Sequence, residues 1–372
     1  MATQGHKPRG ILPGIQLLRG WAAILVVIFH ANGMMGHAPY FGTHPFVLGD
    51  VGGFGVAVFF VISGFIIAIV ALDPAGAPTM SLRDYAIRRF MRIVPFMWLC
   101  VIGYNLLSFA GTREMEWAPF LRAMVVWPVG ELKPNVLWSL RHEFLFYLLF
   151  ALTMLLPVRR PWVLAAWFAA PLVLWLALLP FPLETTPWHP YRLEIVRVVL
   201  FGSESGANLQ IGAGFLLGLA WLAGKPALRE RVPYGLGVAT AAVTAGALII
   251  IAEGSPPGLA RTVLWTGLSA GIVYLGIVGR APDGPLRRMG MLLGNASFAI
   301  YLVHNPALLV LLEASKRVRG LLPLPAFLVV FVVAATLAGV FVHLLVEKPL
   351  ISWLAHGRRV APWMRRRPAD RQ

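Results

Sequence analysis

The feature that most constrains this chain is a succession of apolar runs, each about 20 residues long. A helix of that length crosses roughly 30 Å of hydrocarbon, and in lipid every backbone polar group must find its partner inside the helix. Hydrophobic residues make up 58% of the 372 residues and charged residues only 13%, about half the charged fraction of a soluble domain. The composition therefore excludes disorder and a coiled coil. We expect an all-α, polytopic membrane protein.

Charged or Pro/Gly-rich breaks divide these runs into about ten candidate spans. A further run at 117–129 is short and contains Arg122 and two prolines, so an interfacial or re-entrant piece is predicted there. Gly214 and Gly218 form a small-xxx-small pair that indicates close helix packing. The expected spans are 15–33, 51–72, 93–110, 138–157, 161–181, 209–223, 233–252, 262–279, 291–312 and 323–346.

The distribution of basic residues predicts the orientation of the spans. With ten spans and the N-terminus inside, most of the 32 Lys and Arg residues lie on the inner side, as cytoplasmic loops require. The net charge of +16 is therefore explained by cytoplasmic loops that lie beside anionic lipid headgroups. It does not indicate nucleic-acid binding. We expect a membrane domain at 1–355 and a basic cytoplasmic tail at 356–372, with both termini cytoplasmic. A single cysteine, Cys100, predicts neither a disulfide nor a cysteine-based metal site.

Four ionisable side chains inside the spans are candidate functional groups, because a charge there is costly unless it is paired or faces a cavity. Arg19 and His30 stand in the first span, about 16 Å apart along a helix axis and close to one face. Glu143 stands near the outer end of the fourth span and His304 in the outer half of the ninth. A neutral imidazole near a carboxylate can remove a proton from a hydroxyl. His30, Glu143 and His304 therefore predict a proton-abstracting centre.

Simpler roles remain open for each of these residues. An embedded histidine often serves as a helix-packing hydrogen bonder, and Arg19 can extend to the inner headgroups. Glu143 can pair with Arg141 or His142 at the interface. If it does not, we expect Glu143 to orient His30 or to share its proton, without acting as a nucleophile.

A basic cluster precedes the third span. Arg89 and Arg92 are three residues apart and share a face on a helix, with Arg88 beside them. Paired guanidinium groups suit phosphate, which they hold bidentately, whereas the alternative is a set of ordinary inner-side charges. An inner phosphate site and an outer proton-abstracting centre are what transfer of an acyl group to an outer hydroxyl would require.

Six short motifs occur in order across residues 12–350. They are Leu18-Arg19-Gly20 with Phe29-His30, the Phe59-Phe60-Val61-Ile62-Ser63-Gly64-Phe65 run, the Arg88-to-Pro95 segment, Trp138-Ser139-Leu140 with Glu143, Phe146 and Tyr147, Tyr301-Leu302-Val303-His304, and Glu347-Lys348-Pro349. Together they resemble acyltransferase family 3, whose members O-acylate surface and secreted glycans. Two departures stand out: Ala57-Val58 replaces an acidic position, and Phe298 replaces a tyrosine.

The resemblance implies a multi-pass acyltransferase of the bacterial inner membrane. It implies acetyl-CoA or another acyl-CoA as donor, a glycan acceptor such as an exopolysaccharide, and no metal. His30 would be the catalytic base, helped by Glu143, Arg19 and His304. Arg88, Arg89, Arg92 and Arg19 would hold the CoA phosphates, and Trp138, Ser139 and Tyr301 would bind substrate.

A different class of function remains as an alternative. Intramembrane His, Arg and Glu side chains also serve proton-coupled transporters and flippases of glycans or small anions. A transferase consumes labelled acetyl-CoA in detergent, whereas a transporter needs a sealed compartment. The residues leave open the acceptor sugar and hydroxyl, the acyl chain length, transfer through an intermediate or partner, and the oligomeric state.

Overall fold

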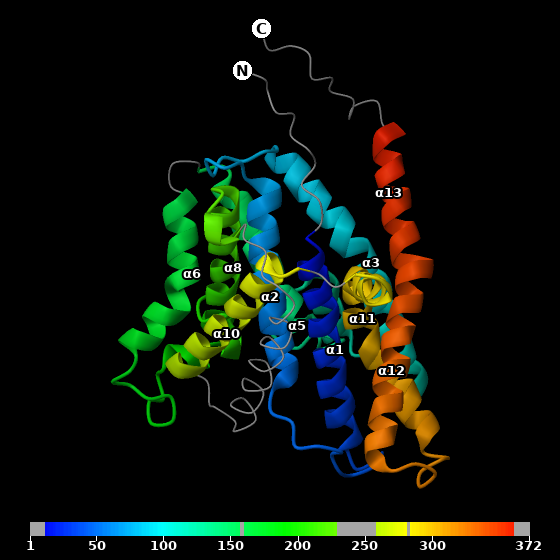
Figure 1. The fold of residues 1–372 in the computed structure, drawn as a ribbon. Coiled ribbons are helices and arrows are strands. Elements are labelled where there is room, and N and C mark those ends of the chain that lie inside the picture. Colours follow the sequence, from blue (N-terminus) through cyan, green and yellow to red (C-terminus); the bar gives the residue numbers. More distant parts are fainter. Residues whose placement is uncertain (1–11, 157–159, 229–257, 281–282, 361–372) are drawn as a thin grey trace.

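The computed structural model describes residues 12–156, 160–228, 258–280 and 283–360 (Figure 1). Its regular elements are helices, apart from one isolated β-bridge between Leu72 and Pro78. They are α1 (Pro13–Met35), α2 (Val51–Ala71), α3 (Leu82–Thr112), α4 (Trp117–Val125), α5 (Leu137–Thr153), α6 (Arg160–Ala177), η1 (Pro190–Arg192), α7 (Glu194–Val199), η2 (Ser203–Ser205), α8 (Ala207–Leu222), η3 (Pro226–Leu228), α10 (Leu259–Val278), α11 (Pro285–Ser315), α12 (Leu324–Val342), η4 (His343–Glu347) and α13 (Lys348–Val360).

Six helical segments among the described residues are long and apolar enough to cross a membrane. They are α1, α2, α3, α10, α11 and the continuous stretch Leu324–Ala355. The spans expected at 138–157, 161–181 and 209–223 correspond to the shorter helices α5, α6 and α8. The span expected at 233–252 and residues 361–372 of the expected basic tail lie outside the described residues. The chain is a multi-pass membrane protein, and the part of it that the structure describes contains six candidate spans.

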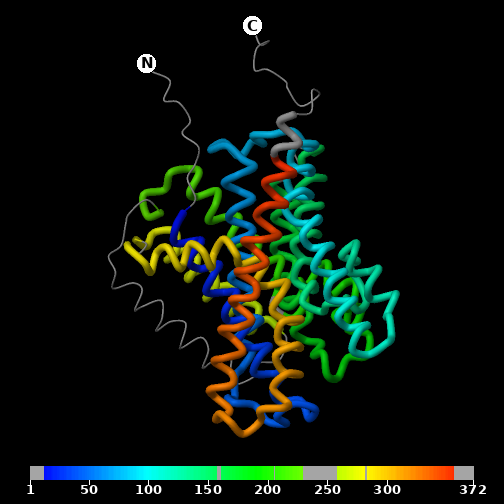
Figure 2. The backbone as a smooth tube through the Cα atoms, turned by 90° about the vertical axis from the view of Figure 1, so that its right-hand side faces the viewer, coloured from blue at the N-terminus to red at the C-terminus, as the bar shows by residue number. Residues whose placement is uncertain are grey.

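Two helices extend well beyond the apolar runs that predicted them. α3 begins at Leu82, capped by the Ser81 side chain, so its first turns carry the three arginines on the helix itself. α12 does not end after its apolar run, because a π-helical turn, η4, joins it to α13. Both views show the stretch from α12 to α13 as one continuous rod (Figures 1 and 2). The arginines of α3 and Glu347 of η4 are therefore parts of long helices and not of loops.

The connection between α3 and α5 lies at the side of the bundle (Figure 2). Its helix α4 has nine residues and is about 14 Å long, too short to span a bilayer. Trp117, Leu121 and Val125 recur every four residues on its exposed face. These features agree with the interfacial piece predicted at 117–129.

Helix α2 lies at the centre of the fold, between α1 and α8 (Figure 1). Glycines allow this close approach: a Cβ atom at Gly64 would lie 1.9 Å from the Ile211 carbonyl oxygen, and one at Gly214 would lie 1.8 Å from that of Val61. A Cβ atom at Gly218 would meet Ala68 at 2.5 Å. The helix-packing interpretation of Gly214 and Gly218 is confirmed.

The Gly214→Val variant should lose stability because the added side chain meets the backbone of α2. Overpacking typically costs about 1–3 kcal/mol, and a backbone contact cannot be relieved by a rotamer change. We expect a lower midpoint of thermal unfolding in detergent, measured by intrinsic fluorescence. The control is Gly103→Val on α3, where nothing lies within 4 Å of the added Cβ. Equal midpoints for both variants would contradict the packing role.

Candidate functional site

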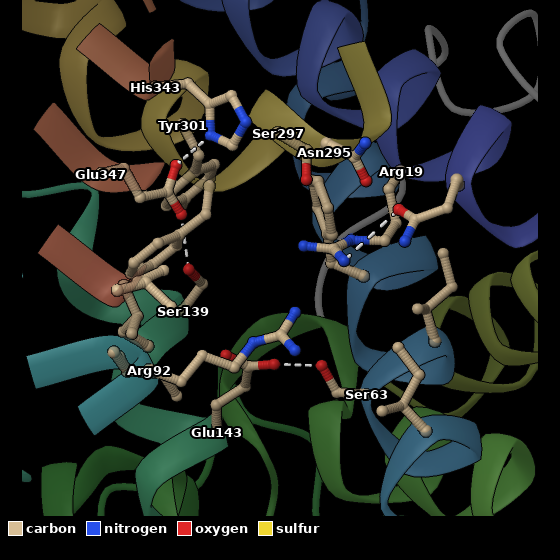
Figure 3. Close-up of a pocket in the computed structure, with 18 of the residues that line it drawn as sticks. Arg19, Ser63, Arg92, Ser139, Glu143, Asn295, Ser297, Tyr301, His343 and Glu347 are labelled. Atoms are coloured by element: carbon tan, nitrogen blue, oxygen red, sulfur yellow. Dashed lines mark hydrogen bonds and ion pairs between the residues drawn. The ribbon is translucent and has the colours of Figure 1, made fainter. Parts of the chain in front are cut away.

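A cavity of about 600 Å³ lies inside the helix bundle, beside the start of α1, the third turn of α3 and the π-helical turn η4. Side chains of α1, α2, α3, α5, α11, η4 and α13 line it (Figure 3). Its wall has both apolar side chains, such as Val56, Phe60 and Ile66, and many polar ones. A cavity of this size accommodates a small organic molecule or a large part of a nucleotide-sized one.

Four basic side chains line this cavity, against two carboxylates. The basic ones are Arg19, Arg89, Arg92 and Lys348, and the acidic ones are Glu143 and Glu347. Figure 3 shows the guanidinium groups of Arg19 and Arg92 directed toward the same space. The excess of positive charge makes the cavity suited to an anion that carries more than one negative charge.

The three arginines predicted from the α3 motif have different surroundings. The Arg89 guanidinium lies 5.5 Å from the ring centroid of Tyr147 and 5.9 Å from that of Tyr85, so two aromatic faces hold it in place. Arg92, one turn further along α3, also lines the cavity, whereas Arg88 is exposed and is not part of the lining. The helix places Arg89 and Arg92 on the cavity face and turns Arg88 away from it.

Glu143 lies within this basic cavity. Its carboxylate accepts hydrogen bonds from the Ser63 hydroxyl and, at 3.2 Å, from the Tyr147 hydroxyl. The neighbouring residues on α5 have other partners: Arg141 donates to the Gly130 carbonyl at 2.6 Å, and His142 Nε2 lies 2.8 Å from Ser203 Oγ. Neither of them pairs with Glu143, so the local ion pair considered above is not formed.

The π-helical turn supplies a second carboxylate. His343 Nδ1 and Glu347 Oε2 are 2.6 Å apart across η4, and Glu347 is buried. Isolated π-helical turns inside longer helices are frequent at functional sites, because the extra residue redirects side chains. Here the turn brings both His343 and Glu347 to the cavity wall.

Tyr301 lines the cavity and is held there by hydrogen bonds to α5 and to the residue before it. Its hydroxyl donates to the Val136 carbonyl at 2.7 Å and lies 2.6 Å from Ser139 Oγ. Ser139 and Tyr301 both line the cavity, and their role as substrate-binding residues stays a prediction. Trp138 does not line it and packs against the rings of Phe60 and His142.

His30 and His304 form a pair on the far side of Tyr301. His304 Nε2 lies 2.9 Å from His30 Nδ1, and the two ring planes are within 27° of each other, with centroids 5.0 Å apart. His304 is fully buried, and its ring lies 5.9 Å from that of Tyr301. Neither histidine lines the cavity. Tyr301 is therefore the side chain shared by the cavity wall and the surroundings of the histidine pair.

The expected pairing of His30 with Glu143 does not occur in the structure. The first turn of α5 is already inside the bundle, where Ser139 meets Tyr301, and Glu143 follows it by one turn, about 6 Å. Glu143 therefore lines the cavity together with Arg19. His304 lies one turn after Tyr301 on α11 and outside the cavity lining. The carboxylate therefore joins the arginines, and the partner of His30 is His304.

Several cavity residues received no role from the sequence. Ser63 belongs to the Phe59–Phe65 run, and Glu347 belongs to the last of the six motifs. The motifs include these residues but do not predict which side chains they contact. His343, Gln16 and Asn295 stand in segments with no motif, and only the fold shows that they line the cavity. Among the described residues, no group of three or more His, Cys, Asp or Glu side chains is arranged to hold a metal ion.

Comparisons with known proteins agree on one family. The family model described as "Acyltransferase domain" matches residues 12–344. The chain is 29% identical to "Exopolysaccharide production protein ExoZ" of Rhizobium meliloti, over 91% of this chain and 100% of that protein. It is 26% identical to "Acyltransferase MdmB" of Streptomyces mycarofaciens, over 94% of each.

A third relative matches over a shorter segment. "Putative peptidoglycan O-acetyltransferase YrhL" of Bacillus subtilis is 29% identical over 102 residues, which are 27% of this chain and 14% of that protein. No solved structure shows a significant match to the chain.

The cavity should bind a polyvalent phosphate through Arg89 and Arg92. Inorganic pyrophosphate is a suitable probe, and its affinity can be measured from the rise in thermal unfolding midpoint that it causes. A charge-assisted hydrogen bond contributes roughly 1.5–3 kcal/mol, so Arg89→Ala and Arg92→Ala should each weaken binding about 10- to 100-fold. Arg88→Ala is the matched control, because Arg88 does not line the cavity. If all three substitutions weaken pyrophosphate binding equally, the effect comes from the net charge of the protein, and the prediction of direct contacts is wrong.

Proposed function

The chain belongs to acyltransferase family 3, and from this premise we propose that it transfers an acetyl group from acyl-CoA to a hydroxyl of an exported polysaccharide. The observation that carries the proposal is the two-part site, a basic cavity and a histidine pair, with Tyr301 between them. The polysaccharide acceptor is supported by two relatives whose names refer to exopolysaccharide production and to peptidoglycan O-acetylation.

The cavity has the features that an acyl-CoA donor requires. Arg89 and Arg92 line it on one face of α3 and Arg19 on α1, which gives several guanidinium groups for the phosphates. Polar and apolar side chains further in, from Ser63 to Tyr301, can contact the uncharged arm. A bound thioester would supply an acyl carbon that is activated for transfer. The residues present therefore fit the donor.

His30 is the proposed catalytic base. In this role it accepts the proton of the acceptor hydroxyl as that oxygen forms the new ester bond. Arg19 lies on the same helix, about 16 Å away along the axis, so α1 joins the donor end of the site to the reacting end. Glu143 is proposed to balance the arginines in the cavity and to fix Tyr147 beside Arg89, through its contacts with Ser63 and Tyr147.

The proposed topology is that of ten spans in a bacterial inner membrane, with both termini and the arginine end of the cavity in the cytoplasm. The excess of basic residues in the loops on that side supports it. Acyl-CoA is a cytoplasmic metabolite, so this orientation places the donor site where its ligand is present. The acceptor would then approach His30 from the other side.

The reaction itself can be tested with purified protein in detergent. Labelled acetyl-CoA and polysaccharide from a strain that lacks the gene are the substrates, and label in the polysaccharide is the product. A proton-coupled transporter would show no such transfer, because it needs a sealed compartment. Restoration of polysaccharide acetylation when the gene is returned to the same strain is the matching measurement in cells.

The His30→Ala variant should abolish transfer without loss of the fold. Removal of a general base typically lowers the rate by about 10²–10⁴-fold. The measurement is the initial rate of label transfer, together with the unfolding midpoint and pyrophosphate binding as evidence of an intact donor cavity. Turnover near that of the unaltered protein in a folded His30→Ala variant would remove His30 from the mechanism.

A further inference from the structure

We infer that His304 is the positioning residue of the reaction: it fixes the tautomer of His30 so that His30 Nε2 faces the acceptor unprotonated, and it takes the place of the carboxylate that usually orients a catalytic histidine. This inference rests on the proposed acyl transfer. The observations behind it are the contacts of the two rings, their burial and the distribution of carboxylates around them.

The backbone of α11 determines the tautomer of His304. His304 Nδ1 lies 3.1 Å from the Ile300 carbonyl oxygen, one helical turn earlier. A carbonyl oxygen can only accept, so Nδ1 must carry the hydrogen and donate it. His304 is fully buried, and no carboxylate forms an ion pair with it within the described part of the chain, so it is neutral. Its Nε2 is then an acceptor only.

The tautomer of His30 follows from that of His304. Its Nδ1 lies 2.9 Å from His304 Nε2, and since His304 Nε2 only accepts, His30 Nδ1 must donate. A neutral His30 that is protonated on Nδ1 has a bare Nε2. The Ile300 carbonyl thus sets two protonation states in series, with the Val26 carbonyl as a further acceptor beside the His30 ring, and the result is a free base at His30 Nε2.

The carboxylates of the site are engaged elsewhere. Glu143 accepts from Ser63 and Tyr147, and Glu347 is paired with His343. In sites where a carboxylate orients a histidine, it also stabilises the imidazolium that forms during the reaction. Here the neutral imidazole of His304 has that role. It accepts the hydrogen bond from His30 Nδ1 and stabilises the positive charge that forms on His30.

The proton movements balance as follows. The acceptor hydroxyl gives its proton to His30 Nε2 while its oxygen bonds to the acyl carbon and the carbon–sulfur bond of the thioester breaks. The positive charge on His30 is shared with His304 through the Nδ1–H···Nε2 hydrogen bond. His30 Nε2 then returns the proton to the departing sulfur, so both histidines end in their starting states and the products are an ester and a thiol.

Two substitutions separate positioning from a structural role. His304→Gln keeps an acceptor oxygen near the position of Nε2, and His304→Leu fills similar space without one. We expect His304→Leu to lower kcat about 10²–10⁴-fold, as loss of an orienting group does in other histidine-based sites, with the KM for acetyl-CoA changed less than threefold. His304→Gln should recover most of this loss and remain within about tenfold of the unaltered kcat. Similar kcat values for the two variants would overturn the inference.

A second readout does not depend on acyl transfer. Nitrogen NMR of the ¹⁵N-histidine-labelled protein reports which ring nitrogen carries hydrogen, and the His30→Ala spectrum identifies the His30 signals. We expect His30 to be protonated on Nδ1 in the unaltered protein and in His304→Gln, and to shift toward Nε2 protonation in His304→Leu. Protonation on Nε2 in the unaltered protein would contradict the inference. The expected spectra together with absent transfer activity would instead count against the proposed function.

Discussion

The cost of placing charge inside an apolar helix bundle governs this structure. Arg19, Glu143 and Glu347 lie among helices whose other residues are largely apolar, and an isolated charge there would cost several kcal/mol. The fold meets this cost by gathering the cationic and anionic groups around one cavity. His30 and His304, which can be neutral, do not line the cavity and lie on the far side of Tyr301. Separation of the charged side chains of the cavity from the neutral histidine pair is therefore a consequence of solvation.

The helices that provide this separation also connect its two parts. α1 carries Arg19 toward one end and His30 toward the other, and α11 carries Ser297 on the cavity wall and His304 beyond it. Both helices pack closely, because Gly20 and Gly294 leave no room for a side chain between them. The distance between Arg19 and the proposed base His30 is thus set by helical rise, and the packing of α1 on α11 by backbone contact; neither depends on a loop.

The sequence was most informative where long apolar runs and helical spacing act locally. It predicted an all-helical membrane fold, the short piece at 117–129 and the common face of Arg89 and Arg92. It could not predict contacts between helices distant in the chain. Glu143 was expected beside His30 because both stood near outer ends of spans, yet α5 enters the bundle so deeply that Ser139 already contacts Tyr301. The π-helical turn that brings Glu347 to the cavity has no simple periodicity and was equally hidden.

The decisive measurement is a structure of the protein with bound CoA, because the proposed reaction requires the donor to lie in one direction in the cavity. We expect phosphate groups within hydrogen-bond distance of Arg89 and Arg92, and the sulfur atom near Ser139 and Tyr301. CoA bound outside the cavity, or bound with its sulfur atom beside the arginines, would exclude the proposed donor site.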